Sequence, residues 1–445
     1  MEPIRIRLFA LACGLLLVPG LAAAQDEEVS APLVSTDGGA LGRYLQPAEF
    51  TNVIDAFDED DPFDLNVSIG YERTLRRGKV RRESNNPGVS EDGYIDYVDL
   101  ARYSQLTNTL VISGAIGLYH DLQLWTRWPL VLSDTRELKL DDAVTAEQGQ
   151  LRRDCGTGGA DPETCLFDLP FKSPERSGVD SFSLGLDWGI LSQERDDTKP
   201  NWVLGVEAAF GIGSQLEAAT EDEDGGISRG TVLLAASSSF SHRYRYLEPY
   251  LGVRFSIEIP KGDSLFPDAD EFKGRLNTLP PIVGAMLFGA EIVPWENAQS
   301  FQRFSIDLRA SGTFNSEGRN YSELFDALGT SQHPQILQPN KSGQEFNGMT
   351  DVENYGTFAG RLSLNVQAAR YVKFNLGAIL AHDQEHGITF TDACNPDADV
   401  AVAQAPCTRG APNPDHRPVI DLPGHRFRVE ESTIFTFFAT GTAMF

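Results

Sequence analysis

The sequence predicts an all-β protein: a transmembrane, antiparallel, up-and-down β-barrel of about 12 strands with short periplasmic turns and long extracellular loops. Three observations support this fold class. Apolar and polar residues alternate at period two in many segments, short and long connections alternate between those segments, and no amphipathic helical pattern could cover the apolar face of a sheet. Because lipid offers no hydrogen-bond partners, a sheet that crosses a membrane must close on itself.

The predicted strands begin near residue 65 and are roughly ten to fifteen residues long. In 301–315, phenylalanine, isoleucine and leucine alternate with arginine, serine and aspartate, and 355–368 and 371–381 repeat the pattern. Each segment therefore has one apolar face and one polar face. The predicted strands are 65–77, 104–118, 122–133, 180–193, 201–213, 229–241, 246–259, 282–293, 301–315, 355–368, 371–381 and 430–445, an even number, as in bacterial single-chain barrels.

The connections between these segments are alternately short and long. Only "YHD" separates the second and third segments, and the other short connections lie near 194–200, 242–245, 294–300 and 369–370. A barrel with both termini in the periplasm has short turns on that side and long loops outside. The long connections are 78–103, 134–179, 214–228, 260–281, 316–354 and 382–429.

The N-terminal part of the chain divides into two further segments. Residues 1–24 combine Arg5 and Arg7, an apolar stretch and an alanine run, which is typical of a secretory signal peptide, so we expect the mature chain to begin near Gln25. Residues 25–62 are polar and acidic, and we interpret them as a periplasmic or plug segment, with a flexible leader as the alternative. The barrel then comprises 63–445.

The last predicted strand, "STIFTFFATGTAMF", carries apolar or small residues at every second position up to Phe445. We expect it to pair with the first strand, near 65–77, because that pairing closes the barrel. The alternation ending in Phe445 resembles the assembly signal of bacterial outer-membrane barrels. The resemblance implies that the barrel-assembly machinery is a partner of the C-terminal strand.

Charge and cysteine content narrow the class of protein further. The formal net charge is -27, which argues against nucleic acid as a partner. The cysteines outside the signal peptide fall into two close pairs, and in an exported chain these predict two local disulfides rather than a metal site, because no CxxC is present. They are Cys155 with Cys165 and Cys394 with Cys407.

The polar faces of the strands predict a lumen lined by charges of both signs. These side chains either set the selectivity of a narrow pore or neutralise one another in a filled lumen, and the sequence leaves both open. The predicted pore-lining residues are Glu72, Arg127, Asp187, Glu207, Arg254, Glu258, Arg303, Asp307, Arg309, Arg361 and Lys373.

A dense basic run, "RTLRRGKVRRE", opens the first long connection. Arginine pairs bidentately with phosphate, so a basic run at the outer surface predicts contact with lipopolysaccharide and outer-membrane lipid. The alternative is a solvated charged hairpin. The predicted contact residues are Arg76, Arg77, Lys79, Arg81 and Arg82.

The last long connection contains four of the seven histidines, including His382 and His386 in "HDQEH". This spacing suits zinc on a helix, but no helical pattern surrounds it, so we predict no metal and no cofactor. A hydrolase would need Asp383 with one of these histidines, and Ser432 on the next strand. No nucleophile motif supports that arrangement, so we predict no catalytic residues and no enzyme.

Two further stretches carry a resemblance to a family. "AIGLYHDLQLWTRWPL" (115–130) and "SGVDSFSLGLDWGIL" (177–191) resemble the outer-membrane transporters of a phenol-degradation meta pathway. The resemblance implies a Gram-negative outer-membrane location and a passive channel for small, apolar or aromatic solutes, although the cysteine-bearing loops are not part of the family's pattern. The matching positions are Gly117, Asp121, Pro129, Gly178 and Asp180.

Three functions therefore remain open. The first is a narrow passive channel or transporter for small molecules. The alternative is a non-conducting structural or surface-display barrel whose disulfide-bearing outer loops bind partners. A barrel hydrolase is third.

Overall fold

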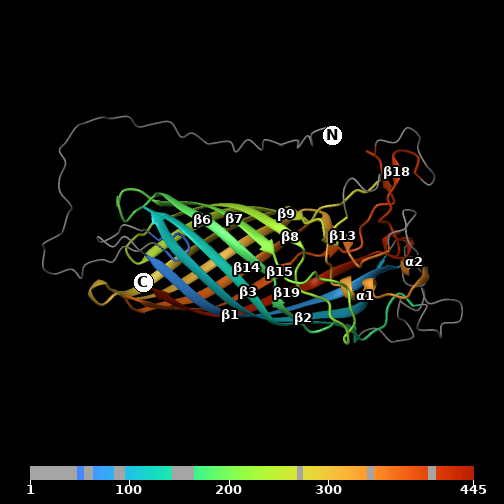
Figure 1. The fold of residues 1–445 in the computed structure, drawn as a ribbon, viewed down its shortest axis with the longest axis horizontal. Coiled ribbons are helices and arrows are strands. Elements are labelled where there is room, and N and C mark those ends of the chain that lie inside the picture. The colour runs from blue at the N-terminus through green and yellow to red at the C-terminus, as the bar shows by residue number, and fades with distance from the viewer. Residues whose placement is uncertain are drawn as a thin grey trace. The chain divides into compact units, whose positions relative to one another are not determined.

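The computed structural model describes residues 48–54, 64–84, 96–142, 165–267, 274–337, 345–398 and 407–445. Within these ranges the chain forms a closed antiparallel barrel of twelve strands, in which neighbours in sequence are neighbours in space (Figure 1). The barrel strands are β1 (Leu65–Ser84), β2 (Asp96–Tyr119), β3 (Leu122–Leu140), β6 (Ser181–Leu191), β7 (Asn201–Gly211), β8 (Thr231–Ser241), β9 (Leu247–Pro260), β10 (Val283–Asn297), β11 (Gln302–Asn315), β14 (Tyr355–Ala369), β15 (Val372–Asp383) and β19 (Phe427–Met444).

This confirms the predicted fold class and all twelve predicted strands. The largest differences are at the long-connection ends of β1, β2 and β3, which extend beyond the predicted limits, and β19 also begins earlier than predicted. In these extensions Val80, Leu100, Leu138 and Val429 are buried against loop residues instead of facing lipid. The simple alternation is therefore lost although the hydrogen-bonded ladder continues.

The barrel closes between β1 and β19, as predicted. Their register runs from Asn66 opposite Met444 to Arg82 opposite Phe427, with one irregularity between Arg77 and Lys79. Beyond the last ladder pair, Leu65 and Phe445 exchange two backbone hydrogen bonds, of 3.0 and 2.9 Å. The backbone of Phe445 is therefore held by the first strand.

The outer face of the barrel is apolar and exposed. Phe288, for example, is 61% exposed, and similar side chains project from every part of the wall. A water-soluble monomer rarely exposes so continuous an apolar surface, whereas a barrel in lipid requires one. Exposed aromatic side chains near the short turns form the girdle expected at a membrane interface: Tyr119, Trp188, Tyr244, Tyr246, Trp295 and Tyr371.

The two ends of the barrel differ. Short turns and the C-terminus lie at one end, the short-turn end, and the small elements lie at the other, the long-loop end (Figure 1). Among the described residues no helix is long and apolar enough to span a membrane. The small elements are β4 (Phe171–Lys172), β5 (Arg176–Val179), β12 (Gly318–Asn320), α1 (Phe325–Gly329), α2 (Pro334–Leu337), β13 (Thr350–Val352), β16 (His386–Gly387), β17 (Cys394–Asn395), β18 (Ala411–Pro412) and α3 (Pro418–Asp421), with the 3-10 turn η4 (Ala298–Ser300) at the short-turn end.

We call the described residues of the long connections the cap. The cap has its own apolar core, in which Leu324, Leu328 and Ile420 pack against the extended ends of the barrel strands. A second, smaller cluster is built around Phe325 and Met349. Buried apolar contact of this kind makes the cap a folded layer at the long-loop end rather than a set of separate loops.

Candidate lumen site

All eleven predicted pore-lining residues lie on the face opposite the exposed apolar side chains. On β11, for example, Leu308 is exposed outward while its neighbours Asp307 and Arg309 contact Tyr250 across the lumen face. The same alternation holds on β3, where Trp128 is exposed outward and its neighbour Arg127 faces the lumen. The polar side of each strand therefore faces the inside of the barrel.

Most of these charges have an ion-pair partner of opposite sign. The ion pairs are Glu72–Arg127 at 3.2 Å, Glu207–Arg254 at 2.8 Å, Glu258–Arg229 at 3.1 Å and Arg303–Glu291 at 2.9 Å. Asp187 instead accepts a 2.8 Å hydrogen bond from Gln123. The alternation in the sequence identified both members of the first two pairs, but it missed Arg229 and Glu291, because the partner depends on strand register and loop position.

The lumen is not completely filled by these side chains. The side chains of Arg127 and Glu72 keep 47% and 38% of their surface exposed, although both lie inside the barrel. Arg254 keeps 42%. A fully packed lumen would bury such groups, so the middle of the barrel contains space accessible to water.

Residues 48–54 occupy part of the lumen. Glu49 pairs with Lys373 of β15, and its backbone N–H donates to Glu291 of β10 at 2.9 Å. The ring of Phe50 lies 4.9 Å from that of Tyr250. Thr51 hydrogen-bonds Ser241 at 2.7 Å. These contacts join the segment to strands on several sides of the barrel, and it therefore crosses the lumen.

The same segment continues toward β3, where the backbone N–H of Ile54 donates to Gln123 at 3.0 Å. The acidic stretch that follows in sequence lies outside the described residues. The segment assigned from sequence to 25–62 is thus described only in 48–54. No sequence signal identified Phe50 as a lumen residue, because it lacks any periodic neighbourhood.

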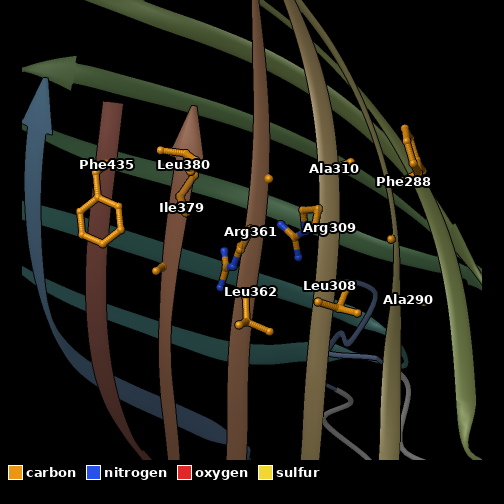
Figure 2. Close-up of a pocket in the computed structure, with 13 residues that line it drawn as sticks. Phe288, Ala290, Leu308, Arg309, Ala310, Arg361, Leu362, Ile379, Leu380 and Phe435 are labelled. Atoms are coloured by element: carbon orange, nitrogen blue, oxygen red, sulfur yellow. The ribbon is translucent and has the colours of Figure 1, made fainter. Parts of the chain in front are cut away.

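One pair of arginines stands apart from the neutralised charges. Arg309 of β11 and Arg361 of β14 are directly opposite each other in the antiparallel ladder. Figure 2 shows them on adjacent strands, with Leu308 and Leu362 at the alternate positions. Like charges directly opposite on one sheet face repel each other. Phe438 of β19 is buried beneath Arg361, with 4.4 Å between the guanidinium carbon and the ring centre.

The lipid-facing side of this wall region has a shallow depression (Figure 2). Small residues form its floor, namely Ala290, Ala310, Gly360 and Ala378, and larger apolar side chains stand around it, including Phe288, Leu380 and Phe435. Its surface is almost entirely apolar, which suits contact with lipid acyl chains.

A buried ion pair joins α1 of the cap to β5, which is hydrogen-bonded to the barrel strand β3. Arg176 and Asp326 form a two-pronged pair at 2.6 and 3.2 Å, and Arg176 also donates to the backbone oxygen of Glu217 at 3.0 Å. Because both charges are buried, removing one would leave the other without compensation. Beneath the cap lies a cavity of about 270 Å³ lined by Arg76, Arg136, Arg229, Tyr103, Tyr321 and Glu323 among others.

The basic run of β1 is distributed over both faces of the wall. Arg77 is exposed, while Lys79 pairs with Asp99 and Glu431, and Arg81 with Asp99 and Glu430. Two residues correct the expectation of a lipopolysaccharide contact, because they do not lie on the outer surface: Arg76 points inward to Glu323 and Asp383, and Arg82 is fully buried beneath the cap, donating to Val419.

The residues considered for a hydrolase do not form a catalytic arrangement. Asp383 is held by Arg76, Thr357 and Ser432, so its oxygens serve structural bonds. His382 is exposed, whereas His386 is buried and stacks on Tyr355 at 3.9 Å. The searched residues contain no group of histidine, cysteine or acidic side chains that could hold a metal ion.

The cysteines agree with the predicted pairing where the structure describes them. Cys394 and Cys407 are joined by a disulfide across the last long connection. Cys165 is disulfide-bonded, and Cys155 lies outside the described residues. Residues 1–24, predicted to be a signal peptide, also lie outside them.

Comparisons with known proteins give weak structural likenesses. No family model and no curated protein matches the chain. An outer membrane channel from Pseudomonas putida F1 is similar at 10% identity and a TM-score of 0.40, covering 85% of this chain and 95% of the channel. A Pseudomonas aeruginosa FadL homologue gives 9% and 0.30, covering 86% and 90%. The outer membrane protease OmpT from Escherichia coli gives 8% and 0.25, covering 86% and 97%. At these values the likenesses assign no function.

Proposed function

We propose that the chain is an outer-membrane channel that conducts small molecules through a narrow, charged lumen. The observation that carries the proposal is the incomplete burial of Glu72, Arg127 and Arg254 inside the barrel. Space next to paired charges of both signs admits water and small solutes, and the charges set which solutes pass. The resemblance to phenol-degradation transporters adds small apolar or aromatic solutes as the candidate class.

The segment 48–54 acts in this proposal as a plug. It crosses the lumen and is held mainly by polar contacts, with Phe50 as its one ring contact. A short segment held in this way can be displaced at moderate cost, since each exposed or half-exposed ion pair contributes about 1 kcal/mol or less. The cap would limit access from the long-loop end.

A second function, a non-conducting surface-display barrel, is favoured by one specific observation. The cap has a buried core and a disulfide, and a folded surface of this kind can bind a partner without any transport. In that case the plug and the cap close the lumen permanently. Conductance distinguishes the two proposals.

The experiment is single-channel recording in planar bilayers with three proteins: the full chain, a deletion of residues 25–62, and Glu49→Gln, which removes the partner of Lys373. We expect stepwise currents from the full chain, larger ones from the deletion, and more frequent openings from Glu49→Gln. Glu223→Gln, in an exposed loop, is the control. Heat-modifiability on gels verifies folding of each variant.

Silent bilayers from correctly folded protein, including the deletion, would reject the channel in favour of the display barrel. Equal currents from the full chain and the deletion would keep the channel and reject the plug.

We further propose that the barrel lies in the Gram-negative outer membrane with the cap outside. Arg77, which is exposed, then contacts lipopolysaccharide phosphates, with the ion-paired Lys79 and Arg81 beside it. Phe445 serves as the signal for the barrel-assembly machinery. Replacing Arg77 by glutamine should weaken binding to lipopolysaccharide micelles, and deleting Phe445 should lower the amount of assembled barrel in cells.

A further inference from the structure

We infer that Arg309 and Arg361 form a binding subsite for a small organic carboxylate, with an aromatic body preferred. The inference rests on the proposed transport function, because it names the class of solute that the lumen selects. Binding can nevertheless be measured without conductance, so the two can fail separately.

The first support is the incomplete pairing of Arg361. Within the described chain this arginine has no hydrogen bond and no ion pair, and its buried Nε lacks a partner. Its guanidinium lies over the ring of Phe438. Arginines facing the lumen elsewhere in the same wall, such as Arg303 and Arg254, have an acidic partner.

The second support is the local excess of positive charge. Arg309 lies opposite Arg361 in the ladder and reaches Asp307 at 3.6 Å. Asp307 is also occupied by the hydroxyl of Tyr250 and by Ser363. Asp307 therefore pairs with Arg309 alone and leaves Arg361 without an ion pair, and an anion placed between the two guanidinium groups would relieve their repulsion. A planar guanidinium fork matches a carboxylate.

The third support is the aromatic surround. The guanidinium carbon of Arg309 lies 4.6 Å from the centre of the Phe50 ring and 5.4 Å from that of Tyr250. Phe438 covers the opposite side, beneath Arg361. A flat apolar body attached to the carboxylate would contact these rings, whereas an inorganic anion would use the guanidinium groups alone. The geometry thus selects benzoate-like anions over phosphate or acetate.

The test is equilibrium binding of benzoate to the full chain in nanodiscs, with benzyl alcohol, acetate and inorganic phosphate as comparison probes. We expect benzoate to bind more tightly than each of the other three. Arg361→Gln should weaken benzoate binding more than about tenfold, because a charge-assisted hydrogen bond is lost. Arg361→Lys keeps the positive charge but loses the two-pronged guanidinium group. Its affinity for benzoate should therefore lie between those of the full chain and Arg361→Gln.

The matched control is Arg102→Gln, which removes an exposed arginine outside the lumen site that already has a partner, Asp141. We expect it to change benzoate binding less than about twofold, because its guanidinium is already satisfied. Equal binding of benzoate and benzyl alcohol would overturn the inference, as would unchanged benzoate binding in a folded Arg361→Gln barrel. Tighter phosphate than benzoate would show a general anion site and overturn the aromatic preference. Benzoate binding to a barrel that never conducts would keep the subsite and reject the channel.

Discussion

Substitution of Asp326 by asparagine should release α1 from β5, the cap strand that pairs with the barrel strand β3, without unfolding the barrel. Asp326 precedes the middle of α1, and its carboxylate accepts two hydrogen bonds from Arg176 at 2.6 and 3.2 Å and one from the backbone N–H of Ala219 at 3.3 Å. The side chains of the ion pair are 1% and 6% exposed, so water cannot replace the lost partner. The charge of Arg176 would remain buried and uncompensated.

Breaking a buried pair by removing one partner costs about 3–5 kcal/mol. We take about 3 kcal/mol, because asparagine keeps one accepting oxygen and Arg176 keeps its bonds to the backbone oxygens of Glu217 and Gly225. This corresponds to a rise of roughly 100-fold in the population in which α1 is undocked from β5. The barrel strands, which are held by their own ladder, should be unaffected.

The assay is amide hydrogen exchange in nanodiscs, followed by mass spectrometry. Peptides covering 324–329 should exchange about 100-fold faster in Asp326→Asn, while peptides from β10 and β11 stay unchanged. Asp222→Asn, in the exposed loop between β7 and β8, is the matched control. Exchange that rises less than about fivefold in 324–329 would refute the reasoning that this pair anchors α1 to β5. Faster exchange throughout the barrel would refute the separation of cap and barrel.

Three further predictions concern the cap. Burial raises the pKa of Asp421 from 3.8 to about 8, so the folded cap binds this proton more tightly than the unfolded chain does. Cap stability should therefore fall as pH rises from about 4 to 8; hydrogen exchange of α3 should accelerate over this range, and Asp421→Asn should remove the dependence. Replacing Cys394 and Cys407 by serine should destabilise the segment between them by about 3 kcal/mol, seen as faster proteolysis there, with unchanged heat-modifiability. Gly226→Ala should destabilise its loop by at least about 1 kcal/mol, because φ at this residue is +59° and the new Cβ would lie 1.8 Å from the backbone oxygen of Gln215. The same proteolysis assay measures this effect, and Gly262→Ala, whose new Cβ would have no atom nearby, is the control.

The sequence predicted the barrel well because lipid imposes a simple rule on it. Side chains that face lipid must be apolar, whereas side chains that face the lumen can be polar. Each strand therefore alternates between apolar and polar residues, as Leu308 and Arg309 illustrate on β11. Strand segments that do not face lipid are not bound by this alternation. At the long-loop ends of β1 and β2, Val80 and Leu100 face the cap core, so the strands continue without a readable pattern.

The site was predictable only in part. The alternation along each strand placed the charged side chains on the inner face. It could not show which of them form ion pairs, because that depends on the register and tilt of the strands. The run from Arg76 to Arg82 suggested a single basic surface, whereas the structure sends Arg76 inward and covers Arg82 with the cap. Phe50 lies in a segment without periodicity, and its position in the lumen comes only from long-range contacts.

The seam between β1 and β19 joins residues that are nearly the whole chain apart, Asn66 and Met444. Every other pair of neighbouring barrel strands can form as the chain emerges, but this one cannot begin until the last strand exists. Until then two long edges with unpaired backbone groups are available to any other strand, including the same edge of a second molecule. Insertion must therefore be faster than edge-to-edge association, or the open sheet must be shielded while it waits.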